Sequence, residues 1–402
     1  MNKQGAKRMD YQLEIEKSQQ ACEILDELDI ACWLVWVRET SQTPDPVLEL
    51  ILGGDVVWRS AFLFTRDGEK IGIVGNFDVD AIKAKGIYDR VVPYTEGIRD
   101  QLVSELDKFR PRQIAINFSK DNVAADGLTV GMLMKLKEYL KDTPYLNRLA
   151  SAEEIVTRLR GRKIENESAR IIGAINITEA IYKKMESFVR VGMTEIEVYR
   201  YFHELMKEYD VTSAWNEDHN PAVDAGPDKQ FGHSGPTENR IKKGHLLHFD
   251  FGVRWQGYCS DIQRMFFFGS RSAIPEEVQT AFETVRDAIQ EASRYISPGV
   301  LGYEVDALAR KFVKDRGYEE YQHALGHQVG LRAHDGGTLL GPLWERYGNS
   351  PKGVVEAGNV FTLELYVTTS DYGQVSLEEN ILVTRSGCQF LSNPQSDLIC
   401  IE

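Results

Sequence analysis

Gly244-His245-Leu246-Leu247-His248-Phe249-Asp250 and Gly358-Asn359-Val360-Phe361-Thr362-Leu363-Glu364 are two stretches of this 402-residue chain that share one pattern. In each, a carboxylate stands six residues after a glycine, and apolar residues alternate with other residues between them. Side chains alternate between the two faces of a strand, so each acid is expected opposite the apolar residues of its own strand. Both stretches are therefore predicted to be strands that present one acid.

A second acid follows each stretch, Asp261 after the first and Glu378 after the second. We expect both to occupy strand positions, so that each stretch becomes a hairpin with two acids. Buried like charges repel one another unless cations neutralise them. Two hairpins that turn four acids toward a common interior therefore predict a pocket for divalent metal.

The internal similarity extends upstream of the two hairpins. Gly192-Met193-Thr194-Glu195-Ile196-Glu197-Val198 resembles Gly299-Val300-Leu301-Gly302-Tyr303-Glu304-Val305, and both are predicted to open helices. In the first, Thr194 and Glu197 have the spacing of a capping box. The C-terminal part of the chain is thus expected to contain two diverged copies of a helix–helix–hairpin unit, which would bring the hairpin acids face to face.

The N-terminal third alternates helix and strand patterns. Helices are predicted over 11–28, 97–109 and 128–140, and a hairpin joins strands at 61–65 and 70–74 through Asp67-Gly68. This favours a small α/β domain with a mixed sheet. The charged stretch 158–163 marks the expected boundary, which gives domains at 1–155 and 160–402.

Composition narrows the class of protein. Hydrophobic residues make up 42% and charged residues 27%, as in ordinary soluble proteins. The net charge of −14 argues against nucleic acid or an anionic membrane as partner. Five scattered cysteines, no secretory signal pattern and no apolar run of membrane-spanning length favour a cytoplasmic protein.

Histidines gather near the second hairpin. His323, His327 and His334 stand in one short segment, and His233 stands in a Gly/Pro loop ahead of Asp250. Oxygen and imidazole donors suit hard or borderline divalent ions. On strand parity His248 shares the face of Asp250, where we expect a supporting or surface role rather than metal binding.

With FDFG, YCSDIQR, HALGHQVG and LEEN around them, Asp250, Asp261, His327, Glu364 and Glu378 resemble the ligands of the M24-type metallopeptidases, the group of aminopeptidase P, prolidase and creatinase. The similarity runs from about residue 158 to 378. It implies an α+β fold, with a pita-bread catalytic domain of two pseudo-symmetric halves preceded by a smaller creatinase-like α/β domain.

The resemblance also implies residue roles. Asp250 would bind one divalent ion and His327 the other, and Asp261 and Glu378 would bridge the two ions. Glu364 would ligate the second ion and accept a proton from the metal-bound water, which leaves a metal-bridging hydroxide. His233 and His334 would hydrogen-bond the substrate amide and the developing oxyanion, and His323 would line the substrate site. Manganese is the first choice of metal, with cobalt, zinc or iron as alternatives.

The chain departs from the usual pattern of that group at four places. Leu365-Tyr366 replaces Pro-Gly after Glu364, Gln263 replaces a threonine, Ser376 replaces an arginine, and Ser350, with Lys352 nearby, replaces the arginine of dipeptide-specific relatives. None of these changes removes a metal ligand. A strict dipeptidase is the reading that they weaken most.

We therefore expect a dinuclear metal-dependent hydrolase, an Xaa-Pro aminopeptidase- or dipeptidase-like exopeptidase that acts as a homodimer on peptide or small amide substrates. One alternative is a hydrolase or lyase of a small non-peptide metabolite on the same scaffold. Another is a non-catalytic interaction module, which the complete set of five ligands disfavours.

Overall fold

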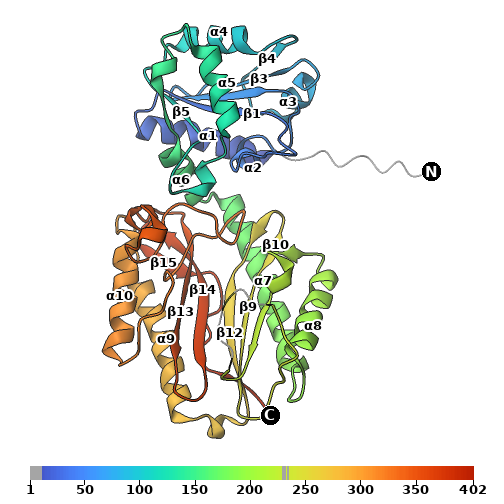
Figure 1. Ribbon diagram of the computed structural model, residues 1–402, viewed down its shortest axis with the longest axis vertical. Helices are drawn as coiled ribbons and strands as arrows, with labels where there is room; N and C mark the ends of the chain where they lie inside the picture. Colours follow the sequence, from blue (N-terminus) through green and yellow to red (C-terminus); the bar gives the residue numbers. More distant parts are fainter. Residues whose placement is uncertain (1–10, 229–231, 233–234) are drawn as a thin grey trace, which may run out of the picture. The chain divides into compact units, whose positions relative to one another are not determined.

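The computed structural model describes residues 11–228, 232 and 235–402. The chain forms two compact units, Met1–Arg160 and Gly161–Glu402 (Figure 1). The boundary falls inside the charged stretch 158–163, and the expected domains differ from these units by a few residues. Helix α6 (Glu153–Gly161) occupies this stretch.

The N-terminal unit is a six-stranded mixed sheet in the order β4-β3-β2-β1-β5-β6. Its strands are β1 Cys32–Val37, β2 Ser60–Thr65, β3 Lys70–Gly75, β4 Arg90–Tyr94, β5 Ile114–Ile116 and β6 Leu149–Ser151. Its helices, besides α6, are α1 Gln12–Glu27, α2 Leu48–Ile51, α3 Val79–Lys85, α4 Arg99–Phe109 and α5 Val130–Leu140. The predicted hairpin is confirmed, since β2 and β3 pair antiparallel. The three predicted helices correspond to α1, α4 and α5.

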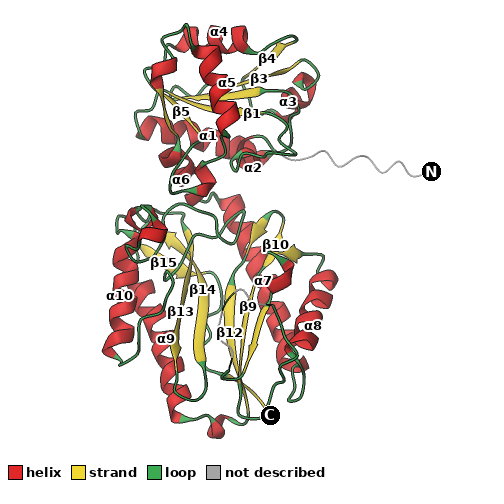
Figure 2. Ribbon diagram, in the orientation of Figure 1, coloured by secondary structure: helices red, strands yellow, loops and turns green. Residues whose placement is uncertain are grey.

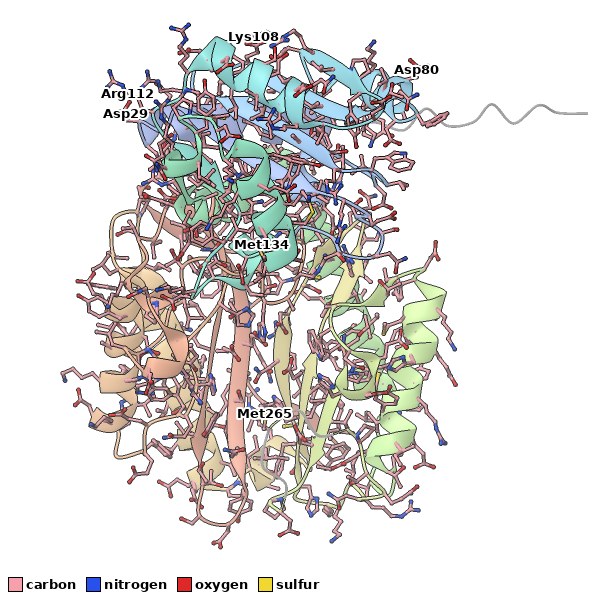
Figure 3. The ribbon with its side chains drawn as sticks, turned by 45° about the horizontal axis from the view of Figure 1, so that its top comes forward. Asp29, Asp80, Lys108, Arg112, Met134 and Met265 are labelled. Carbon is pink, nitrogen blue, oxygen red and sulfur yellow. The ribbon has the colours of Figure 1, made fainter. Side chains whose placement is uncertain are left out.

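Both faces of this sheet are covered. All six residues of β1 are buried, as expected for a central strand of an α/β sheet. Leu102 and Leu106 of α4 and Leu136 of α5 pack in the same apolar cluster as the sheet. Met134, labelled in Figure 3, lies on the outer face of α5 and is 67% exposed.

The C-terminal unit has strands on the inside and long helices outside them (Figure 2). The helices are α7 Glu165–Phe188, α8 Glu195–Glu208, α9 Glu276–Tyr295 and α10 Gly302–Asp315. The strands are β7 Thr212–Ser213, β8 Ala222–Ala225, β9 Leu246–Phe251, β10 Val253–Trp255, β11 Tyr258–Cys259, β12 Ile262–Phe268, β13 Val360–Thr368, β14 Gln374–Thr384, β15 Gly387–Phe390 and β16 Ile399–Ile401. Short 3-10 helices lie at Val123–Ala125, Leu146–Arg148, Glu217–His219, Arg271–Ala273, Glu345–Tyr347 and Ser350–Lys352 across the two units.

These elements divide into two halves. One half contains α7, α8 and the sheet β16-β12-β9-β8, and the other contains α9, α10 and the sheet β13-β14-β15. Strands β12 and β14 lie side by side at the junction of the halves (Figure 1). A third, three-stranded sheet, β11-β10-β7, belongs to the first half. The predicted pair of helix–helix–hairpin units is present.

Backbone hydrogen bonds repeat between the halves. The N–H of Gly192 donates to the carbonyl of Ile241, and that of Gly299 donates to Val355. The glycines that open the two hairpins also correspond. Gly244 has φ +82° and bonds the end of β12, and Gly358 has φ +91° and bonds the end of β14. A positive φ strains residues that carry a Cβ, so both strand starts depend on glycine.

Local sequence explains the helix starts. The predicted capping box is confirmed: the N–H of Thr194 donates to Glu197 at 2.7 Å, and the N–H of Glu197 donates to the Thr194 hydroxyl at 3.1 Å. In the second copy the N–H of Leu301 donates to Glu304. The leucine side chain has no oxygen that could accept a hydrogen bond from the N–H of Glu304. This copy therefore keeps only one of the two hydrogen bonds of a capping box.

A large apolar core fills the second half and extends into the first. It includes Phe282 and Val285 of α9, Phe361 and Leu377 of the second hairpin, and Met265 of β12. Met265, which is labelled in Figure 3, is fully buried. Within the part of the chain that the structure describes, no helix has both the length and the apolar character needed to cross a bilayer.

Candidate metal centre

The second hairpin places two acids directly opposite each other. Glu364 of β13 pairs with Glu378 of β14 in antiparallel register. Directly opposed residues share one face of a sheet, and like charges there destabilise it. The side chain of Glu364 is 17% exposed and that of Glu378 only 1%. This face therefore requires a positive partner.

The first half presents its acids differently. Asp250 lies on β9 opposite Gln263 of β12, whereas Asp261 lies in the break between β11 and β12. The expected strand position for Asp261 is therefore wrong, because β10 and β11 interrupt the hairpin. Asn380 of β14 fixes the backbone of Asp261 instead, accepting from its N–H at 3.4 Å and donating to its carbonyl at 2.6 Å.

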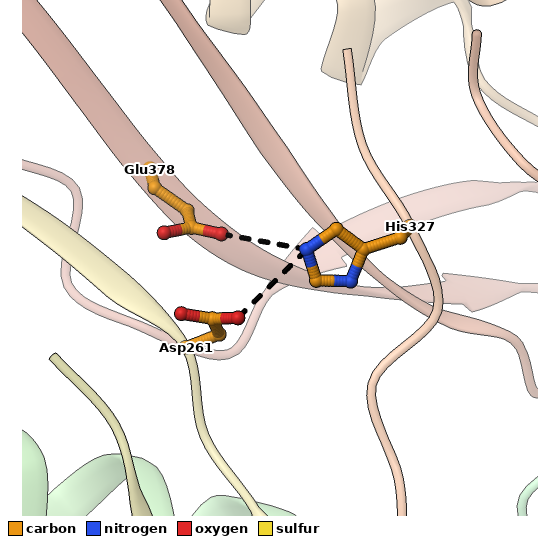
Figure 4. A group of neighbouring side chains, drawn as sticks. All are labelled: Asp261, His327 and Glu378. Atoms are coloured by element: carbon orange, nitrogen blue, oxygen red, sulfur yellow. Dashed lines mark ion pairs between the residues drawn. The ribbon is translucent and has the colours of Figure 1, made fainter. Parts of the chain in front are cut away.

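His327 faces these acids from the loop that follows α10. Its Nε2 lies 3.4 Å from Glu364, 3.8 Å from Asp261 and 4.0 Å from Glu378. Its Nδ1 lies 3.1 Å from the carbonyl of Ala333, which can only accept, so the ring proton belongs on Nδ1. The Nε2 lone pair is left pointing at the carboxylates (Figure 4).

Burial and mutual repulsion govern the titration of this group. Burial, followed by the charges of Asp250 and Glu364, raises the pKa of Asp261. Burial and Asp261 raise the pKa of Glu378. Burial and Asp250 raise the pKa of Glu364 to about 8. Burial, followed by the nearby His334, lowers the pKa of His327 and keeps its ring neutral.

The residues fit a divalent cation. Asp261, His327 and Glu378 each offer a ligand atom, and these atoms lie within 4.8 Å of one another. The Nε2 distances are too long for good hydrogen bonds. Glu378 Oε2 is buried and has no hydrogen-bond partner among the described residues. A cation would satisfy the lone pairs and the excess negative charge together.

The other predicted residues lie around this group. The His334 ring packs edge-on against His327, with centroids 4.2 Å apart. His323 is half-buried between Tyr321 and Tyr366, 5.4 Å from each ring. Burial lowers the pKa of His323 to about 4. His233 lies outside the described residues.

Three further side chains contact the site: His248, for which a supporting or surface role was expected, and Gln263 and Ser376, two of the departures from the usual pattern. Gln263 donates to Glu364, Ser376 donates to Gln263, and His248 contacts Gln263. Each stands two positions from a predicted ligand: His248 before Asp250, Gln263 after Asp261 and Ser376 before Glu378. Strand parity placed His248 on the face of Asp250, and the same argument could have placed Gln263 and Ser376 at the site, because residues two apart share a face.

Behind the acids, Arg264 joins the two halves. Its guanidinium forms two hydrogen bonds to Glu379, at 3.0 and 3.1 Å, and both side chains are buried. It also donates to the backbone carbonyl of Glu378. Paired, hydrogen-bonded charges of this kind hold β12 against β14.

The remaining departures from the usual pattern lie on β13 and in a short 3-10 helix. Leu365 is buried in the core, and Tyr366 contacts His323. Ser350 and Lys352 belong to a short 3-10 helix, where the exposed Lys352 donates to Asn349.

Comparison with known proteins relates the chain to peptidases. The sequence pattern of metallopeptidase family M24 matches residues 169–385, more than half of the chain. An uncharacterized peptidase of Staphylococcus aureus strain USA300 is 27% identical over 335 residues, which cover 83% of this chain and 87% of that protein.

Two solved structures share the fold. An Xaa-Pro dipeptidase from Bacillus anthracis aligns with a TM-score of 0.73 and 23% identity, covering 96% of this chain and all of that one. An X-Pro aminopeptidase from Thermotoga maritima aligns with a TM-score of 0.69 and 21% identity, covering 96% and 99%. The expected pita-bread fold is thereby confirmed.

Proposed function

Because this chain belongs to metallopeptidase family M24, we propose that it is an exopeptidase that releases the N-terminal residue of a peptide, with Xaa-Pro bonds as preferred substrates. The observation that carries this proposal is the buried group of Asp261, His327 and Glu378, whose ligand atoms converge. The names of the two solved structures support the Xaa-Pro preference.

Two divalent ions per chain are proposed to occupy the site. Asp250 would hold one and His327 with Glu364 the other, and Asp261 and Glu378 would be shared. Four carboxylates carry four negative charges, which two dications neutralise. With oxygen and imidazole donors and no thiolate, the set suits manganese, with cobalt, zinc or iron as alternatives.

When bound, a pair of such ions lowers the pKa of water toward neutrality and polarises the substrate carbonyl. The chain's own side chains would transfer protons and bind the substrate. Glu364 would take the proton of the attacking water and return it to the leaving amine. His334 would donate a hydrogen bond to the substrate, as would His233, and His323 would line the substrate wall.

Location and assembly are part of the same proposal. The five cysteines are free thiols, which supports a reducing compartment such as the cytoplasm. A homodimer is proposed by analogy with the group that the sequence resembles. Sedimentation velocity would test it directly.

A substrate panel tests the proposal. The protein would be reconstituted with Mn²⁺, Co²⁺ or Zn²⁺ and offered Xaa-Pro dipeptides, longer Xaa-Pro peptides, matched Xaa-Ala peptides, and small amidines and betaines. We expect metal-dependent release of the N-terminal residue before proline, and loss of that activity in Asp261→Ala. Turnover of the small metabolites alone would favour the non-peptide alternative, and full activity in Asp261→Ala would refute the mechanism.

A further inference from the structure

Glu364 is held from the opposite half of the unit. The Nε2 of Gln263, on β12, donates to Glu364 Oε2 at 3.1 Å. The other oxygen, Oε1, faces His327 Nε2 at 3.4 Å. Gln263 thus hydrogen-bonds one carboxylate oxygen of Glu364, and the second oxygen remains directed at His327.

The amide of Gln263 has its own supports. Its Oε1 accepts from the Ser376 hydroxyl of β14 at 2.5 Å and lies 3.0 Å from His248 Nε2 of β9. His248 Nδ1 in turn lies 3.0 Å from Asp224 of β8. Gln263, His248 and Ser376 are all buried.

These contacts select one orientation of the amide. With the NH₂ group on Glu364, the carbonyl oxygen accepts from the Ser376 hydroxyl. The flipped amide would set its carbonyl oxygen against the carboxylate oxygens of Glu364, so that one acceptor would face another. The hydrogen bond from Ser376 therefore favours the orientation in which the Gln263 NH₂ group donates to Glu364.

We propose that Gln263 is a positioning residue for Glu364, and that Ser376 and His248 act on the site through Gln263. This inference rests on the proposed function, because it assigns Gln263 the task of aiming a metal ligand. Groups that orient ligands in this way typically affect metal affinity or activity by about 10–100-fold.

The same contact links two departures from the usual pattern. Gln263 stands where a threonine is usual and Ser376 where an arginine is usual. Here the longer side chain lies on β12 and the shorter on β14, and their oxygens are 2.5 Å apart. The two departures therefore meet in one buried hydrogen bond.

Mn²⁺ binding measured by calorimetry tests the positioning role. Gln263→Met keeps the length of the side chain and removes both hydrogen-bonding groups. We expect about 10–100-fold weaker binding of one Mn²⁺ ion and a lower kcat with KM little changed. The matched control is Gln395→Met, because Gln395 is also buried and bonds the backbone of Met265 on β12. The control should lower the melting temperature and leave Mn²⁺ affinity unchanged.

A double-mutant cycle separates positioning from general packing. Ser376→Ala is a milder variant and should weaken Mn²⁺ binding in the same direction. If Ser376 acts through Gln263, adding Ser376→Ala to Gln263→Met should cost nothing further. Wild-type Mn²⁺ affinity in Gln263→Met, or full additivity in the double variant, would overturn the inference. A wild-type chain that binds no divalent ion would instead overturn the proposed function, and the inference with it.

Discussion

The two hairpins of the C-terminal unit supply two acids each, by different local means. In the second, β13 and β14 pair without interruption, and Glu364 stands directly opposite Glu378. In the first, β10 and β11 interrupt the hairpin, and Asp261 lies outside the ladder just before β12. Asn380 of the second hairpin holds Asp261 in place. An uninterrupted ladder can thus fix the ligand geometry of its diverged copy.

The halves also differ in the groups that surround the acids. In two side-chain contacts, Gln263 with Glu364 and Arg264 with Glu379, the first half contributes the donor and the second half the acceptor. Each donor crosses from β12 to the other half. The two copies have therefore become complementary rather than identical, and neither can complete the site alone.

The largest effect is expected when either hairpin loses its proposed shared ligand. Asp261→Asn and Glu378→Gln each remove one buried negative charge, and each should lower kcat/KM by about a thousandfold or more, since metal assistance stabilises the transition state by several kcal/mol. Asp371→Asn, in the exposed turn between β13 and β14, is the control and should match wild type. Equal losses would show that the two hairpins contribute alike, and an active Glu378→Gln variant would contradict the shared role.

The next effect tests the link between the halves. Arg264→Met leaves Glu379 buried without its partner, which should reduce the free energy of unfolding by about 3–5 kcal/mol. Urea denaturation measures this value. Arg271→Met removes an exposed arginine of the same unit and should change stability little. A similarly small change for Arg264→Met would mean that the pair does not hold the halves together.

Metal removal should reveal the repulsion among the four acids. In the metal-free folded protein Glu364 has a pKa of about 8, against 4.5 for the ordinary group. Between these values the folded state binds more protons than the unfolded state, so stability falls as the pH rises from about 5 to 8. The loss should reach a few kcal/mol, since one pKa unit corresponds to about 1.4 kcal/mol.

Thermal melts in excess chelator at pH 5 and pH 8 measure this dependence. Protein loaded with Mn²⁺ should lack the decline, because the cations neutralise the acids. A chelated protein that is equally stable at both pH values would show that the acids do not repel one another as described.

The smallest effect compares the two helix starts. Thr194→Ala removes the side-chain acceptor at the start of α8 and should cost about 1 kcal/mol of unfolding free energy. Thr212→Ala, at an exposed position of β7, controls for the loss of a hydroxyl. A cost near zero would indicate that Glu197 alone caps α8 sufficiently, just as Glu304 alone caps α10.

Much of this architecture follows from sequence pattern. Strand alternation around Asp250 and Glu364, the capping box of Thr194, and the repeat of glycines predicted the two copies. These signals are local, because a strand face or a helix cap depends on residues a few positions apart. Short elements such as α3 and β6 were not predicted, because they contain too few residues for a helical or strand periodicity of apolar residues to be recognised.

The site could be predicted only in part. Strands β10 and β11 interrupt the first hairpin, so Asp261 lies outside the strand ladder. The alternation of apolar and polar residues along a strand does not predict such an interruption. His327 and His334 lie in a segment without regular structure, so their approach to each other depends on tertiary packing. His248, Gln263 and Ser376 did follow strand parity, but their mutual contacts depend on how β9, β12 and β14 meet.

The central claim is that side chains distant in the sequence converge to bind a pair of cations. A crystal structure of the Mn²⁺-loaded protein, with anomalous scattering measured at the manganese edge, tests it most directly. The account predicts two anomalous peaks surrounded by Asp250, Asp261, His327, Glu364 and Glu378. Peaks bound elsewhere, or no peak at this group in protein that retains peptidase activity, would contradict it.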